Sequence, residues 1–294
     1  MRKSKIIIAM ALCVLLTGCG QKQSDDKEPT STDVESPVSE ASTEDLIIFH
    51  NRLKFDKTTE KITSTSFPRM DWVKDIGDSD RRSKTSDAIM SKKNSAESDI
   101  LEYDISYGEE VVWEGLVLNE YIDAYSTDEK NKYRICDLNI TGNRLEILAY
   151  IEGDTEKKFL ILCFDLNDKK YISTEDYDLS DKDINNIPMI DDVVDPMLRS
   201  DMIMFAPVDQ SLCKIIRSDK SFVRITGLKD KLLTAVNEKK YTEKIGWLRP
   251  LAYCDGYVLY YATALSDADL GESGVLCMAV FNDSEELLDL LISK

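Results

Sequence analysis

The chain has 294 residues, of which 55 are Asp or Glu and 37 are Lys or Arg, so its formal net charge is −18. Such an acidic protein repels other anions, which argues against nucleic acid, teichoic acid and anionic lipid headgroups as its main partners. The sequence holds one histidine, His50, which excludes a zinc site built on several histidines and leaves a single candidate for any histidine base.

The first residues have the pattern of an export signal. Three positive charges, Arg2, Lys3 and Lys5, precede an apolar run of eleven residues from Ile6 to Leu16. A helix of that length is too short for the roughly 30 Å hydrocarbon core of a membrane. A charged start followed by a short apolar run is typical of a signal peptide rather than of a membrane span.

The end of this segment resembles the lipobox of bacterial lipoproteins. Leu16-Thr17-Gly18-Cys19 has an aliphatic residue, two small residues and then a cysteine. The resemblance implies that residues 1–18 are a signal peptide cleaved after Gly18, and that the Cys19 sulfur carries a lipid. It also implies attachment to the extracytoplasmic side of the membrane, at the bacterial cell surface. Two or more acyl chains would make that attachment stable.

A polar tether follows the expected anchor. Residues 20–45 contain eight acidic residues, two lysines and only three apolar residues, Val34, Val38 and Ala41. Such a segment cannot bury enough apolar surface to offset the entropy of ordering it. Residues 19–45 are therefore expected to be a lipidated cysteine followed by a disordered acidic linker.

The remaining chain, residues 46–294, has the pattern of β-strands. Short runs rich in Val, Ile, Leu, Tyr and Phe alternate with Gly, Asn and Asp, and no long stretch shows a clear amphipathic helical period. Two stretches, Tyr133–Thr174 and Trp247–Ser293, each contain four candidate strands and three turns. A third copy, Ile187–Thr226, is less regular, and residues 52–67 and 100–114 each match the outer two strands of such a unit.

Repeated four-stranded antiparallel units of about 40 residues predict an all-β, propeller-like array. The strings "YDISYGEEVV" and "FDLNDKKYI" are similar to the outer hairpins of bacterial propeller repeats in general. Dividing the domain by the unit length gives about six units, although only three complete and two partial copies can be identified. A β-sandwich is the alternative architecture.

The unit pattern makes further predictions about individual strands. The run "FLILCF", residues 159–164, is apolar at successive positions, as expected for a strand covered on both faces. Asp255-Gly256 predicts a tight hairpin turn with positive φ at both residues. In contrast, the polar, partly basic segment 74–98 is expected to be a long exposed loop.

Five cysteines follow Cys19: Cys136, Cys163, Cys213, Cys254 and Cys277. Within the two best units, one cysteine falls in the first strand and one in the third. Such strands lie roughly 9–10 Å apart, which is too far for a disulfide. Because Cys163 and Cys277 lie in strongly apolar runs, these cysteines are expected to be buried thiols without a structural disulfide.

No motif for a cofactor, a metal or a catalytic triad is present, and no catalytic residue is expected. His50 lies in a predicted strand, where a structural or surface role is expected. The loop Asp267–Ser273 has alternating acids like a calcium loop, but Gly271 replaces the third ligand. An aromatic group in the last unit could form a platform for a carbohydrate or could simply fill the strands: Trp247, Tyr253, Tyr257, Tyr260 and Tyr261.

The sequence therefore predicts a lipid-anchored protein that binds or scaffolds a protein or a glycan of the cell envelope. One alternative is a surface enzyme that acts on glycans through two carboxylates, which would lie about 5–10 Å apart in an aromatic-lined cleft. Another is a solute-binding lipoprotein associated with a transporter, although such proteins are usually two-lobed and rich in helices.

The anchor can be tested with two cysteine variants. Cys19→Ala should remove the lipid and move the full chain out of the membrane fraction, whereas Cys13→Ala, in the expected signal peptide, should leave both unchanged. Cell fractionation and the mass of the purified protein give the result. Equal membrane retention of the two variants would contradict the lipobox interpretation.

Overall fold

The computed structural model describes residues 45–49, 53–67, 80–94, 99–126, 132–153, 156–182, 196–207, 212–239, 244–265 and 274–293. All of them belong to the unit Ala41–Lys294. Cys19, the segment before it, His50 and Asp267–Ser273 lie outside the described residues. None of the helices in the described ranges is long and apolar enough to cross a membrane.

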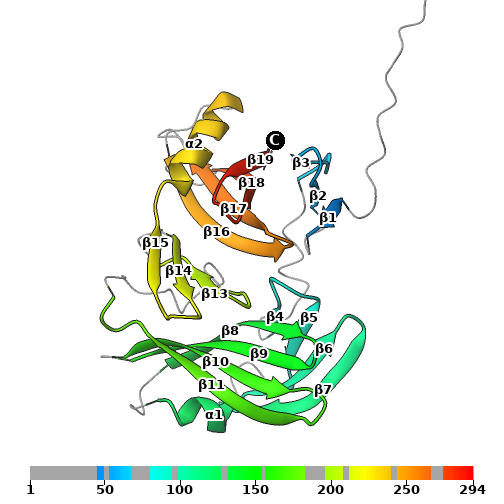
Figure 1. Ribbon diagram of the computed structural model, residues 1–294, viewed down its shortest axis with the longest axis vertical. Helices are drawn as coiled ribbons and strands as arrows, with labels where there is room; N and C mark the ends of the chain where they lie inside the picture. Colours follow the sequence, from blue (N-terminus) through cyan, green and yellow to red (C-terminus); the bar gives the residue numbers. More distant parts are fainter. Residues whose placement is uncertain are drawn as a thin grey trace, which may run out of the picture. The chain divides into compact units, whose positions relative to one another are not determined.

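The strands form five antiparallel sheets that are arranged as a five-bladed β-propeller (Figure 1). The first sheet has three strands: β1 (Leu46–Ile48), β2 (Lys54–Asp56) and β3 (Lys61–Ile62). The second sheet has four: β4 (Arg81–Arg82), β5 (Ala88–Lys92), β6 (Glu102–Tyr107) and β7 (Glu110–Val117). A short helix, α1 (Asn119–Asp123), follows it.

The other three sheets also have four strands each, paired in chain order. The third sheet contains β8 (Lys132–Thr141), β9 (Arg144–Glu152), β10 (Lys157–Asp165) and β11 (Lys170–Asp178). The fourth contains β12 (Met197–Leu198), β13 (Met202–Phe205), β14 (Leu212–Ile216) and β15 (Phe222–Ile225). After helix α2 (Leu228–Lys239), the fifth contains β16 (Lys244–Cys254), β17 (Tyr257–Leu265), β18 (Val275–Asn282) and β19 (Leu287–Ile292).

Apolar side chains pack between neighbouring sheets. Strand β10 shows the principle, because Leu160, Leu162 and Phe164 face the core shared with the second sheet. The alternate residues Phe159 and Ile161 face the core shared with the fourth sheet. Further clusters join the fourth sheet to the fifth and the fifth to the first. The prediction that residues 159–164 are covered on both faces is confirmed.

The first and last sheets are in contact. Strand β3 packs against β19, and the Ile62 backbone N–H donates to the Asp289 carboxylate over 2.9 Å. Lys57 also donates to Asp255, with 2.9 Å between Nζ and Oδ2. Within the fifth sheet, the turn between β16 and β17 has φ of 49° at Asp255 and 85° at Gly256, as predicted.

The predicted propeller is confirmed, and the sandwich alternative is wrong because the strands form five separate sheets. The expected count of about six units is also wrong, because connecting segments and α2 take up residues that the division assigned to strands. Helix α2 was not predicted. It buries only Leu228, Leu232 and Val236, one residue per turn, which is too narrow a stripe to stand out in the sequence.

The segment 74–98 differs most from its prediction as an exposed loop. Its described part, residues 80–94, contains β4 and β5, with Ala88 and Met90 fully buried. The polar turn between these strands, residues 83–87, is named the axial turn here. Ser83 is buried and Lys84, Thr85 and Ser86 are half-buried, because hydrogen bonds within the turn and to other sheets replace solvent, whereas Asp87 is exposed.

The axial turn contacts three other sheets. Lys84 donates its backbone N–H to Asp137 of β8 and its Nζ to the Pro196 carbonyl, and its own carbonyl accepts the Tyr253 N–H of β16 over 2.8 Å. The Thr85 hydroxyl lies 3.1 Å from Asn139 Oδ1. The first strands of the second to fifth sheets also contact one another in order, so the axial turn lies where they converge.

Asp137 is the centre of this junction. It is fully buried, at an irregularity of the β8–β9 register that redirects its side chain. Its Oδ1 accepts the N–H of Leu138 at 2.9 Å and of Lys84 at 3.3 Å, and its Oδ2 accepts the N–H of Leu198 at 2.7 Å. Burial raises the pKa of Asp137 to about 6, against the opposing effects of the Lys84 charge and these three donors.

The cysteines follow the prediction with one exception. Cys136 and Cys163 lie on β8 and β10, Cys254 and Cys277 lie on β16 and β18, and all remain as thiols. Four of the five are buried, whereas Cys254 is exposed at the end of β16, and the expectation of burial is wrong for that residue.

The raised pKa of Asp137 predicts how stability changes with pH. The folded state binds this proton more tightly than the unfolded chain does, so protonation favours folding. Relative to Asp137→Asn, the free energy of unfolding of the native protein should rise by about 1 kcal/mol as the pH falls from about 7.5 to about 5. Urea denaturation at both pH values measures it.

Asp178→Asn is the control, because hydrogen bonds from Ser180 lower the pKa of Asp178 and its effect lies below this pH range. Its stability relative to the native protein should stay constant. If the difference in the free energy of unfolding between Asp137→Asn and the native protein is also constant, the raised pKa of Asp137 is contradicted.

Candidate functional site

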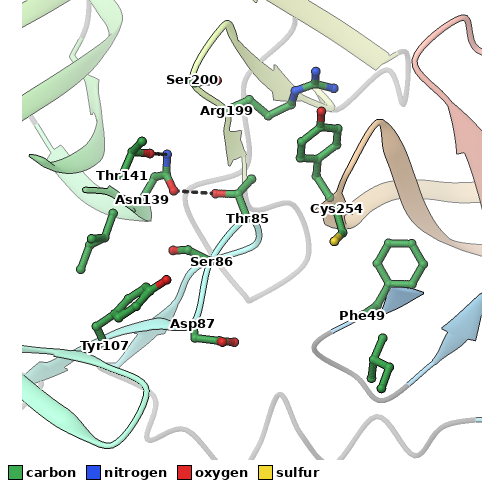
Figure 2. A pocket seen from close by; sticks show the side chains of 13 residues that line it. Phe49, Thr85, Ser86, Asp87, Tyr107, Asn139, Thr141, Arg199, Ser200 and Cys254 are labelled. Atoms are coloured by element: carbon green, nitrogen blue, oxygen red, sulfur yellow. Dashed lines mark hydrogen bonds between the residues drawn. The ribbon is translucent and has the colours of Figure 1, made fainter. Parts of the chain in front are cut away.

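A cavity of about 480 Å³ lies where the sheets converge, and residues of all five sheets or their adjoining turns line it (Figure 2). It is called the central cavity here. The second sheet contributes Thr85, Ser86 and Asp87 of the axial turn together with Tyr107. The third contributes Asn139, Ile140 and Thr141, which end β8. The other residues end or follow β1, follow β12 or end β16: Ile48, Phe49, Arg199, Ser200, Tyr253 and Cys254.

The topology explains why these residues meet. Strands alternate in direction within each sheet, and the first strands of the sheets run in the same direction. These first strands therefore end at the same side of the propeller. The lining residues at the ends of β1, β8, β12 and β16 follow this rule. Tyr107, at the end of the third strand of its sheet, lies on the same side.

Arg199 forms one wall of the cavity and is only 6% exposed. Its Nε lies 3.0 Å from Asp201 Oδ1, and its Nη1 lies 2.7 Å from Asp283 Oδ1. Its guanidinium carbon lies 3.8 Å from the centre of the Tyr253 ring. Burial lowers the pKa of Arg199, but the two carboxylates outweigh that effect and raise it above its usual value. The side chain is therefore a permanent charge held in place by three groups.

The polar residues of the floor are joined to one another. Asn139 accepts a hydrogen bond from the Thr85 hydroxyl at its Oδ1, and its Nδ2 donates to the Thr141 hydroxyl over 3.3 Å (Figure 2). The Ser86 hydroxyl donates to Ser83 over 2.9 Å. These bonds fix the direction of the floor groups before any ligand enters, which lowers the entropic cost of binding.

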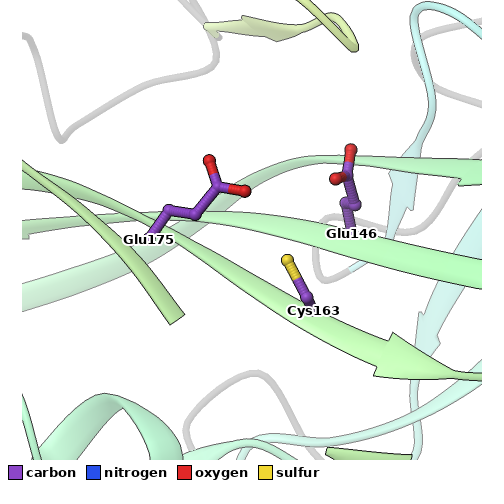
Figure 3. A group of neighbouring side chains, drawn as sticks. All are labelled: Glu146, Cys163 and Glu175. Carbon is purple, nitrogen blue, oxygen red and sulfur yellow. The ribbon is translucent and has the colours of Figure 1, made fainter. Parts of the chain in front are cut away.

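A second group of reactive side chains lies between the third and fourth sheets. Glu146 of β9, Cys163 of β10 and Glu175 of β11 place one potential metal ligand atom each within 4.8 Å of the others (Figure 3). Arg217, after β14, lies between the two carboxylates, with its Nη2 2.8 Å from Glu146 and 2.7 Å from Glu175. Arg144 adds a 2.9 Å ion pair to Glu146 and a 3.0 Å contact to the Cys163 sulfur.

These contacts make the second group an ion-pair junction rather than a metal centre. Two guanidinium groups balance the two carboxylates, so a metal ion would have to displace them. Burial acts to raise the pKa of Glu175, but hydrogen bonds from Arg217 and Tyr177 hold it below its usual value. Burial also raises the pKa of the Cys163 thiol, against the opposing effect of the Arg144 charge.

The aromatic residues proposed as a platform are separated in the structure. Tyr253 lines the central cavity, whereas Tyr260 is buried against Phe281 and Tyr257 packs against Phe55. Tyr261 joins the core between the first and fifth sheets. The Trp247 side chain lies outside the described residues. Tyr257, Tyr260 and Tyr261 therefore pack against other sheets or core residues, and Tyr253 is the described member of this group that lines the cavity.

Other residues of the cavity had no clear signal in the sequence. Thr85, Ser86 and Asp87 lie in the segment expected to be an exposed loop. Arg199 lies between the apolar pair Met197-Leu198 and the polar pair Ser200-Asp201, and no motif marks it. A usable signal existed for Tyr253, because it lies near the end of the first strand of a complete repeat, just before the predicted Asp255-Gly256 turn.

Comparisons with known proteins do not identify a family. No protein-family model and no curated protein matches the chain. Among solved structures, the chain is similar to a europium-containing methanol dehydrogenase, with 12% sequence identity and a TM-score of 0.25 over 55% of this chain. The similar region covers 27% of the length of that protein.

Proposed function

We propose that this chain is a lipid-anchored, extracytoplasmic binding protein that holds a small polar ligand in its central cavity. The observation that carries the proposal is the cavity itself, which receives hydroxyl, amide, aromatic and charged groups from every sheet. The resemblance of Leu16-Thr17-Gly18-Cys19 to a lipobox supports the anchor, and the acidic segment up to residue 45 would separate the propeller from the membrane.

The composition of the cavity supports binding rather than catalysis. Asp87 is the single carboxylate among the described lining residues, whereas glycoside hydrolysis through carboxylates needs a pair. The pair Glu146 and Glu175 lies elsewhere and is held by Arg144 and Arg217. The alternative of a carboxylate-dependent glycan-acting enzyme therefore has less support in the described residues.

The ligand would belong to the cell envelope or its surroundings. A small molecule and the end of a glycan or peptide chain both fit a cavity of this size, which lies within the usual range for ligand sites. A role in delivering a solute to a transporter is compatible with this binding. The two-lobed architecture typical of solute-binding lipoproteins is, however, not that of this five-bladed propeller.

The proposal can be tested by blocking the cavity. Thr141 is exposed and lines it, so Thr141→Trp should fill the space without disturbing a core. The full chain in detergent is incubated with a small-molecule extract of the cell envelope and examined by native mass spectrometry. The native protein should carry a bound molecule that Thr141→Trp loses.

Thr226→Trp is the matched control, because Thr226 is exposed between β15 and α2 and does not line the cavity. It should retain the bound molecule. Equal binding by Thr141→Trp and the native protein would show that the central cavity is not the site.

A further inference from the structure

We infer that the central cavity binds a neutral sugar, either free or at the end of a glycan. This inference rests on the proposed function and specifies its ligand. The evidence is the paired state of the charges that line the cavity, a chain of hydrogen bonds that ends at the Thr141 hydroxyl, and the exposed ring of Tyr107.

The charged groups that line the cavity already have partners. Arg199 is the one cation among the described lining residues, and its guanidinium is bound by Asp201 and Asp283. Asp87 is the one carboxylate among them, and it too has an interaction partner in the chain. A charged ligand would lose water around its charge without meeting an unpaired opposite charge in this lining, which costs free energy. A neutral ligand avoids that cost.

A chain of hydrogen bonds directs a donor into the cavity. The Thr85 hydroxyl donates to Asn139 Oδ1 over 3.1 Å, and Asn139 Nδ2 donates to the Thr141 hydroxyl over 3.3 Å. Because the Thr141 side chain is exposed at the cavity, its own O–H lies at the open end of this chain and can donate to a ligand. Each hydrogen bond polarises the next group, which strengthens the final donor.

The neutral polar groups of the cavity match hydroxyls better than ions. Asn139 is 6% exposed, and its amide offers two N–H groups and two lone pairs, of which the bonds to Thr85 and Thr141 use one each. Within the described part of the chain, one N–H and one lone pair therefore remain for a ligand. A sugar hydroxyl both donates and accepts, so it can bond to either, whereas an ammonium only donates and a carboxylate only accepts.

Tyr107 offers a ring for the apolar face of a sugar. Its side chain lines the cavity and is 46% exposed (Figure 2). The C–H groups on one face of a sugar ring carry partial positive charge, and the face of an aromatic ring is negative. Ile48, 58% exposed at the cavity, adds an apolar contact. The combination of an apolar face and a rim of hydroxyls separates a sugar from other small neutral molecules.

The inference can be tested with sugars that differ only in charge. Saturation-transfer-difference NMR on the full chain in detergent measures the binding of glucose, galactose and mannose, each against its 2-amino and uronic acid analogues. At least one neutral sugar should bind, about tenfold more tightly than its charged analogues, because their added charge loses water without gaining a partner. A linear trisaccharide of the same sugar distinguishes the two sources. Tighter binding than the free sugar identifies the end of a glycan, and weaker binding identifies a free sugar.

Variants of the lining test the two contacts separately. Thr141→Val, which removes the O–H and keeps the shape of the side chain, should weaken binding of the neutral sugar about fivefold, whereas Thr141→Ser should not. Thr226→Val is the matched control, because Thr226 is exposed and does not line the cavity, and its binding should equal that of the native protein. Tyr107→Ala should weaken binding, and Tyr107→Phe, which keeps the ring, should retain it. Circular dichroism checks that the variants fold.

The absence of binding by all three neutral sugars would overturn the inference, and so would charged analogues that bind as tightly as the neutral sugars. Binding that Thr141→Val leaves unchanged would overturn the role of the hydrogen-bond chain. A molecule other than a sugar, captured by the native protein and lost in Thr141→Trp, would leave the proposed binding function standing and refute its sugar ligand. Failure to capture any molecule that depends on the cavity would instead count against the proposed function itself.

Discussion

The buried carboxylate of Asp137 is the interaction on which the centre of this propeller depends. It accepts backbone N–H groups from the second, third and fourth sheets, and the carbonyl of Lys84, one of its partners, accepts an N–H from the fifth. Apolar packing between sheets is not directional and would tolerate small rotations. Hydrogen bonds that converge on one buried side chain tolerate much smaller rotations. A buried N–H group that loses its acceptor cannot bond to water instead.

This constraint also determines the form of the central cavity. The axial turn that bonds to Asp137 supplies the cavity floor, so the floor is held by the same contacts that hold the sheets together. Arg199 extends the arrangement outward, because its side chain forms a cavity wall while its carbonyl accepts a hydrogen bond from Arg217 over 3.1 Å. Through Arg217, the cavity wall is connected to the ion-pair junction of Glu146 and Glu175. The wall and floor of the cavity are thereby held by hydrogen bonds to several sheets.

The repeats predicted most of the fold but little of the site. Strands such as β10 could be recognised because burial on both faces requires apolar residues at successive positions. The axial turn could not, because its residues have the composition of a solvated loop, and the partners of Lys84 and Thr85 lie in other sheets. Asp137 was hidden for the same reason, as one of 55 acidic residues. Tyr253 was noticed as an aromatic residue, and its position just before the Asp255-Gly256 turn is the local feature that separates it from Tyr260, which is buried in the core.

The most direct test of the account is amide hydrogen exchange at the four N–H groups that meet at the axis, those of Lys84, Leu138, Leu198 and Tyr253. If these bonds unite four sheets, all four amides should exchange through one cooperative opening, with a single free energy equal to that of global unfolding. If Leu198 or Tyr253 exchanges much faster than Leu138, the sheets open independently and the proposed central junction does not hold them together.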